Sequence, residues 1–169
     1  MEFADVIRER FSVLEYAHRD VSPELVRAIL DAAMAAPTAC NFQPQRILVI
    51  DDNESREKLY RVVPSRYYVP LAFLVCYDRR DCWVRPVDGK TSGEIDAAIV
   101  TTHMMLRATD LGLGSIWVMN WDPERMKQEF ALSEDLEPVA LLIVDHKASS
   151  ALPKKGHYSS KELNEILIL

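Results

Sequence analysis

Four short and almost continuously apolar runs constrain the fold of this chain more than any other feature. Runs of about four to eight apolar residues between turn residues are typical of strands that are buried on both faces. Helical patterns separate the runs without the strict regularity of βαβ units. The sequence therefore predicts an α+β fold, in which helices flank a central mixed or antiparallel sheet. The predicted strands are residues 47–50, 71–77, 115–119 and 138–144.

The segments between these runs carry helix signals. Ser22 and Pro23 offer a capping hydroxyl and a proline at the first helical position, and Pro37 ends the apolar stripe that follows. Residues 91–94 fit a capping box with Thr91 as the cap, and they open the best-patterned helix of the chain. Helices are predicted over residues 3–12, 23–36, 54–63 (closed by Pro64), 94–111 and 123–132, and residues 161–167 fit either a helix or a strand.

Length and charge limit the class of protein. A chain of 169 residues and 19.3 kDa suits one domain over residues 1–169. Its formal net charge of −6 and the lack of a basic tail argue against a nucleic-acid partner. The N-terminus lacks the pattern of a signal peptide, and no apolar run could cross a bilayer, so we expect a cytoplasmic protein without a membrane partner. The polar C-terminal extension, residues 148–169, is a candidate to reach a neighbouring subunit, with fraying as the alternative.

Residues 35–44 form the most informative connection in the chain. Thr38, Asn41 and Gln43 lie between Pro37 and Pro44, so small donors and acceptors are placed on stiffened backbone. Such a segment could hold a polar, planar ligand. An ordinary loop between a helix and a strand is the alternative interpretation.

Motifs that carry chemistry by themselves are absent from the sequence. There is no nucleophile elbow, P-loop, dinucleotide-binding glycine fingerprint or H-E-x-x-H helix. The cysteines Cys40, Cys76 and Cys82 are an odd number without a C-x-x-C pair, which indicates neither a disulfide framework nor a zinc site. We therefore predict no metal site and no catalytic side chain, and any chemistry must come from a cofactor.

Four pieces of the sequence, taken together in their order and spacing, resemble the nitroreductase family of FMN-dependent oxidoreductases. They are residues 10–13, 36–44, 112–123 and 137–144. The resemblance implies a nitroreductase-like fold and a homodimer with swapped C-terminal tails, with FMN bound at the subunit interface. It also implies a ping-pong reaction in which NADH or NADPH delivers hydride to flavin N5. The electrons then pass to a small aromatic substrate, such as a nitroaromatic or a quinone.

The resemblance also implies roles for individual residues. Arg10 and Ser12 match an R-x-S pattern whose members contact the phosphate and ribityl end of the flavin, and guanidinium suits phosphate oxygens. Backbone near Met119 and Asn120 is expected to face N5 and O4 of the ring. The loop residues that fall on the pattern lying along the ring are Pro37, Thr38, Ala39, Asn41 and Gln43.

Two positions depart from the family pattern. Leu14 and Ser160 stand where relatives commonly carry basic residues. Because the phosphate needs a neutralising charge, a lysine of the C-terminal extension is expected to substitute as a point charge. The candidates are Lys154, Lys155 and Lys161.

Several alternatives remain open at this point. The same fold could support other flavin chemistry, such as flavin fragmentation or reductive dehalogenation. The departures at Leu14 and Ser160 fit a flavin-binding protein without turnover, and a structural domain without cofactor is a third alternative. Five aromatic residues could form a substrate wall, although core packing is an alternative role for each of them: Phe42, Tyr67, Tyr68, Trp83 and Trp121.

Overall fold

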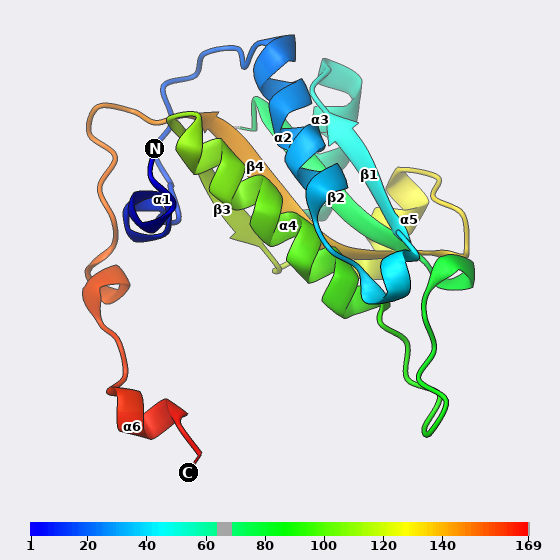
Figure 1. Ribbon diagram of the computed structural model, residues 1–169. Helices are drawn as coiled ribbons and strands as arrows, with labels where there is room; N and C mark the ends of the chain where they lie inside the picture. The colour runs from blue at the N-terminus through cyan, green and yellow to red at the C-terminus, as the bar shows by residue number, and fades with distance from the viewer. Residues whose placement is uncertain (64–68, 169) are drawn as a thin grey trace.

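The computed structural model describes residues 1–63 and 69–168, with the elements drawn in Figure 1. The strands are β1 (Gln45–Ile50), β2 (Leu71–Asp78), β3 (Leu113–Val118) and β4 (Leu136–His146). The α-helices are α1 (Phe3–Glu9), α2 (Pro23–Ala35), α3 (Asn53–Val62), α4 (Gly93–Asp110), α5 (Pro123–Glu129) and α6 (Leu163–Ile166). Short 3₁₀ helices are η1 (Ala39–Asn41), η2 (Arg79–Asp81) and η3 (Lys155–Tyr158).

The central sheet has the strand order β1-β2-β4-β3, and each neighbouring pair is antiparallel. The predicted α+β fold is confirmed, and the choice between a mixed and an antiparallel sheet is settled in favour of antiparallel ladders. All residues of β2 are buried, as its apolar run predicts, because helices cover both of its faces. The ladders extend beyond the predicted runs through polar residues such as Gln45 and His146.

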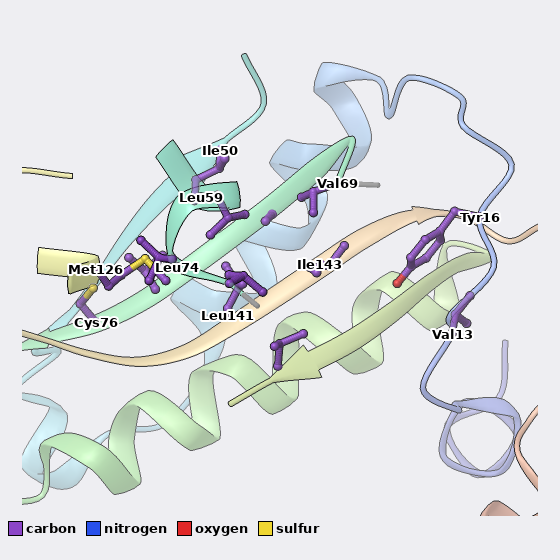
Figure 2. Packing of buried hydrophobic residues seen from close by; sticks show 14 residues of the cluster. Val13, Tyr16, Ile50, Leu59, Val69, Leu74, Cys76, Met126, Leu141 and Ile143 are labelled. Carbon is purple, nitrogen blue, oxygen red and sulfur yellow. The ribbon is translucent and has the colours of Figure 1, made fainter. Parts of the chain in front are cut away.

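Helices cover the two faces of the sheet in separate layers (Figure 1). On one face, α2 and α4 pack against Phe73 and Leu142, and Met104 of α4 is fully buried there. On the other face, α3 and α5 form the cover, and Figure 2 shows Met126 of α5 beside Leu74. The sheet is therefore the middle layer of three, and its strand ends are the places where loops can form a site.

Two predicted helix caps are wrong in detail. Ser22 occupies the N-cap of α2 but its side chain makes no capping hydrogen bond. The predicted capping box of residues 91–94 does not form, because α4 begins at Gly93 with Ser92 as the N-cap. The Ser92 hydroxyl instead donates to Asp96 Oδ2 at 2.7 Å. The first helix is also shorter than predicted and ends at Glu9, since Arg10 already has an extended backbone.

Three residues named by the sequence predictions lie outside the described part of the chain. Pro64, predicted to close a helix, and the predicted wall residues Tyr67 and Tyr68 fall within residues 64–68. Among the helices of residues 1–63 and 69–168, none has the length and apolar character needed to cross a membrane.

The C-terminal extension leaves the sheet after β4 and runs beside α1 to the short helix α6 (Figure 1). Residues 161–167, which fitted either a helix or a strand, contain this single helical turn. The apolar side chains of α6 are largely exposed to solvent, since Leu163 is 65% exposed and Ile166 is 63% exposed. An isolated turn with exposed apolar residues gains little stability from its own chain, so it is a surface that another molecule could cover.

The carboxyl group of Asp78, at the end of β2, makes the stability of the fold sensitive to acid. It accepts hydrogen bonds from Arg80 Nε at 3.0 Å and from Arg80 Nη2 at 2.7 Å. These bonds to Arg80 lower the pKa of Asp78 from 3.8 to about 2. A carboxyl whose folded pKa is lowered contributes stability that is present above its unfolded pKa. That contribution disappears as the pH falls through the folded pKa.

We therefore expect Asp78→Asn to flatten the pH dependence of unfolding between about pH 4 and pH 2. Urea unfolding of both proteins across that range measures the effect. The free energy of unfolding should fall more steeply with decreasing pH in the wild type than in the variant. Equal slopes would show that the Arg80 contact does not stabilise the ionised carboxyl.

Candidate functional site

The loop between α2 and β1 has a strained backbone. Cys40, Asn41 and Gln43 have φ values of 50°, 57° and 53°, which lie in the left-handed region that favours glycine. Inside the loop, the Thr38 hydroxyl accepts a hydrogen bond from the Gln43 amide at 3.1 Å. Strain of this kind persists where surrounding contacts impose it, and it clusters at ligand sites. A loop that only reversed the chain would not need this arrangement. The contacts around the predicted loop residues hold them in it.

The loop is anchored to the first turn of α4. The Ala39 amide donates to Asp96 Oδ1 at 2.9 Å, although the two residues are 57 positions apart in the sequence. Asp96 is only 2% exposed, and its other oxygen accepts from Ser92. Sequence reasoning missed Asp96, because an acidic residue in the first turn of a helix is already explained by the helix dipole.

The predicted Arg10 and Ser12 lie away from this loop, beside the edge strand β3. Ser12 forms a parallel bridge with Ser115, and the Val13 amide donates to the Ser115 carbonyl at 2.9 Å. Gly114 permits this approach, because a Cβ there would lie 2.8 Å from Val13 Cγ2. Arg10 caps the end of α1 directly before this segment. The R-x-S pattern is therefore fixed against the sheet by backbone pairing.

A groove of about 330 Å³, which we call the Ser12 groove, joins this segment to the C-terminal extension. Leu14, one of the two departures from the family pattern, lies in its wall, and Lys154 lies there too. Lys155 and Lys161, the other candidate cations, are not among its lining residues. The lining residues are Phe11, Ser12, Leu14, Ile116, Lys154, Gly156 and His157.

Two further basic side chains at the Ser12 groove were missed by sequence reasoning. His157 lines the groove, with its ring 6.2 Å from the ring of Phe11. Lys147 Nζ lies 5.9 Å from the centroid of Phe11, a cation–π contact. No local motif marks either residue, because only the tertiary fold brings them near Ser12. Ser12, Lys154 and His157 of the lining are a donor set that suits a phosphate group. Lys147 lies next to this lining through its contact with Phe11.

Met119 and Asn120 lie beyond the end of β3, away from the Ser12 groove. Met119 is 63% exposed, and its sulfur accepts from Trp117 Nε1 at 2.9 Å. Asn120 lines a different groove, of about 480 Å³, together with Arg61 of α3 and Arg125 of α5. Within one chain, the structure does not bring these two residues together with Ser12.

The predicted aromatic wall residues divide into different environments. Trp121 packs against the core, donates from Nε1 to the Val118 carbonyl at 2.8 Å, and also lines the groove that contains Asn120. Phe42 lies within the strained loop and is 52% exposed. Trp83 lines an apolar groove of about 350 Å³ together with Ala39, Ile95 and Ile99. We call it the hairpin groove, because an antiparallel bridge between Val84 and Thr91 closes the adjoining segment into a hairpin. In the described part of the chain, the hairpin groove therefore places the aromatic ring of Trp83 next to Ala39 of the loop.

The two predicted halves of the site lie toward opposite ends of α4. Ala39 is bound at Asp96 in the first turn, whereas the N-terminal amine of Met1 binds Asp110 at the last residue of the helix. These two anchor points are about 21 Å apart at a rise of 1.5 Å per residue. The Ser12 groove and the hairpin groove share no lining residue. A single chain therefore presents two half-sites.

Comparisons with known proteins identify the family. A family model described as the nitroreductase family matches residues 7–67 and 71–144. A nitroreductase family protein from Clostridium difficile 630 has a similar crystal structure, with a TM-score of 0.92 and 40% identity over 99% of this chain and 98% of that chain. The chain therefore belongs to the nitroreductase family, a family of FMN-dependent oxidoreductases, as its sequence predicts.

Two further relatives bear on cofactor and activity. A protein of Archaeoglobus fulgidus, named as a candidate NADH dehydrogenase/NAD(P)H nitroreductase, is 32% identical over 90% of this chain and 86% of its own length. A candidate nitroreductase from Desulfovibrio desulfuricans, solved in complex with FMN, is 28% identical with a TM-score of 0.82. The similarity covers 100% of this chain and 96% of that chain. The family model ends at residue 144, so the lysines of the extension lie outside it.

Proposed function

We propose that this protein is an FMN-dependent NAD(P)H oxidoreductase that reduces small, electron-poor aromatic acceptors such as nitroaromatics or quinones. The observation that carries the proposal is the donor set of the Ser12 groove, in which Lys154 would supply the positive charge that relatives commonly carry at the position of Leu14. Names of relatives, including NAD(P)H nitroreductase and NADPH-dependent oxidoreductase, support the reaction class. The two substrates would use one site in turn, in a ping-pong sequence.

In this proposal the Ser12 groove holds the phosphate end of FMN. The Ser12 hydroxyl and the Arg10 guanidinium contact the phosphate and ribityl groups. Lys154 supplies the missing charge, and geometry favours it over Lys155 and Lys161 because it alone of the three lines the groove. The N–H group of the His157 ring would add a further donor. Phosphate recognition therefore uses residues from both ends of the sequence.

The strained loop would lie along the flavin ring. Thr38, Asn41 and Gln43 bring donors and acceptors to the polar edge of the ring, while Pro37 and Ala39 stiffen the loop and keep it narrow. Backbone groups near Met119 and Asn120 are proposed to lie beside the ring from another direction. Neither segment lines the Ser12 groove of its own chain.

A homodimer would join the half-sites. Two copies related by a two-fold axis, with their α4 helices antiparallel, would bring the loop of one copy to the Ser12 groove of the other. Exposed apolar side chains support such a contact, since Ile95 on the outer side of α4 is 65% exposed. The extension, with its exposed Leu163 and Ile166, would then reach over the partner subunit.

FMN, when bound, supplies the redox chemistry by accepting hydride from NADH or NADPH and passing electrons to the acceptor. The residues of this chain would bind the cofactor, orient it and set the electrostatic environment around it. Cationic groups in the Ser12 groove and backbone donors of the loop favour negative charge at the site. Trp83, Ile95 and Ile99 offer an apolar wall for a planar ring in the hairpin groove. No acid–base side chain is required for this division of work.

A second candidate is a flavin-binding protein without turnover. Leu14 favours it, because an apolar residue stands in the groove wall where the family commonly has a cation. Other flavin chemistry on the same fold, such as flavin fragmentation or reductive dehalogenation, is the remaining alternative for a protein that binds FMN.

Anaerobic reduction tests the proposed function. We expect the purified protein to take up FMN and the flavin absorbance in the visible range to bleach on addition of NADH or NADPH. A nitroaromatic or a quinone should then restore the absorbance. A protein that takes up no FMN would contradict the proposal, and bound FMN that neither nicotinamide reduces would favour the flavin-binding candidate.

Lys154→Ala tests the phosphate end. We expect FMN affinity to fall by about three- to tenfold, since a charge-assisted contact is lost at a partly exposed site. The loss should shrink as salt concentration rises, because salt screens exposed charges. Lys155→Ala and Lys161→Ala are matched comparisons from the same extension. A larger loss in either of them would transfer the role to that lysine.

A further inference from the structure

We propose that Asp96 is a positioning residue for the FMN site: its buried carboxylate holds the strained loop in the conformation that faces the flavin ring. The proposal rests on the function proposed above. Asp96 would not touch the cofactor or the substrate. It would act through the Ala39 amide, which lies immediately before the residues with positive φ.

Apart from the bond to Asp96, the hydrogen bonds of residues 38–43 are local. Within the described residues, the other hydrogen bonds to residues 38–43 come from residues 38–46 themselves. They close the turn locally but do not fix its place on the molecule. The bond from Ala39 to Asp96 Oδ1 instead reaches the long helix α4, which is distant in the sequence. Besides the Asp78 amide, which donates to the Pro44 carbonyl at 2.8 Å where the loop joins β1, it is the polar contact that ties the strained backbone to the body of the fold.

The second carboxylate oxygen extends the same anchor to the hairpin groove. Ser92 donates its hydroxyl to Asp96 Oδ2, and its amide donates to the Trp83 carbonyl at 2.9 Å. One buried carboxylate thus fixes both the flavin-facing loop and the base of the segment that carries Trp83. Its place in the first turn of α4, where amide dipoles favour negative charge, makes a buried carboxylate tolerable there.

Substitutions at this anchor separate its two contacts. Asp96→Ala removes both acceptors, and Asp96→Asn keeps the shape of the side chain but leaves only one acceptor oxygen. Ser92→Ala removes the hydroxyl that donates to Asp96 Oδ2, and it keeps the contact of Asp96 with Ala39. Asp110→Asn is the matched control, because it makes the same chemical change at the opposite end of α4.

Two measurements decide the proposal, and the first uses protein without FMN. We expect amide hydrogen exchange of residues 38–44 to accelerate by about tenfold or more in Asp96→Ala. Asp96→Asn should have a smaller effect, while Ser92→Ala and Asp110→Asn leave this segment unchanged. Unchanged exchange in Asp96→Ala would overturn the anchor, whatever the protein binds.

The second measurement uses the FMN-loaded protein. We expect Asp96→Ala and Asp96→Asn to weaken FMN binding, by about tenfold for Ala, and to shift the flavin midpoint potential and visible spectrum. A purely structural role would lower the melting temperature without moving the potential or the spectrum, and that result would overturn the positioning role. A wild-type protein that binds no FMN would instead refute the proposed function, while the exchange result still decides whether Asp96 holds the loop.

Discussion

The packing of α4 on the sheet is the contact on which the other features of the proposed site depend. Ala97, Val100, Met104 and Ala108 turn inward and are fully buried against the strands, so the position of the helix is fixed along its length. The strained loop is attached near one end of this helix, and the N-terminal segment is attached near the other. A rigid spacer therefore keeps the two half-sites apart in each chain, which is why we propose that two copies share a site.

The sequence predicts the strands well because burial on both faces leaves continuous apolar runs, as in β2. It underestimates their length, since Gln45 and His146 pair through the backbone and their side chains carry no strand signal. The sequence also predicts the wrong N-cap for α4, Thr91 in place of Ser92. Ser92 and Thr91 both suit a helix start, and only the structure shows that the Ser92 hydroxyl bonds to the side chain of Asp96, four residues later.

The candidate site was predictable as segments but not as a geometry. Residues 10–13 and 36–44 were singled out, yet neither the left-handed backbone at Cys40 nor the bond from Ala39 to Asp96 leaves a local trace. The sequence also does not show which lysine lies at the Ser12 groove. Three lysines of the extension were equivalent in sequence, and only the path of the folded chain favours Lys154. Contacts between distant segments are what the sequence patterns omit.

Sharing of the site between two subunits is the central claim, and complementation tests it most directly. Ser12→Glu should repel the FMN phosphate in the groove, and Ala39→Trp should block the ring-facing loop, so neither homodimer should bind FMN. When the two variants are coexpressed with different affinity tags and the mixed dimer is purified, one groove and one loop remain intact and face each other. The account predicts one bound FMN per mixed dimer. A mixed dimer that binds no FMN, or a wild-type protein that binds FMN as a monomer, would contradict it.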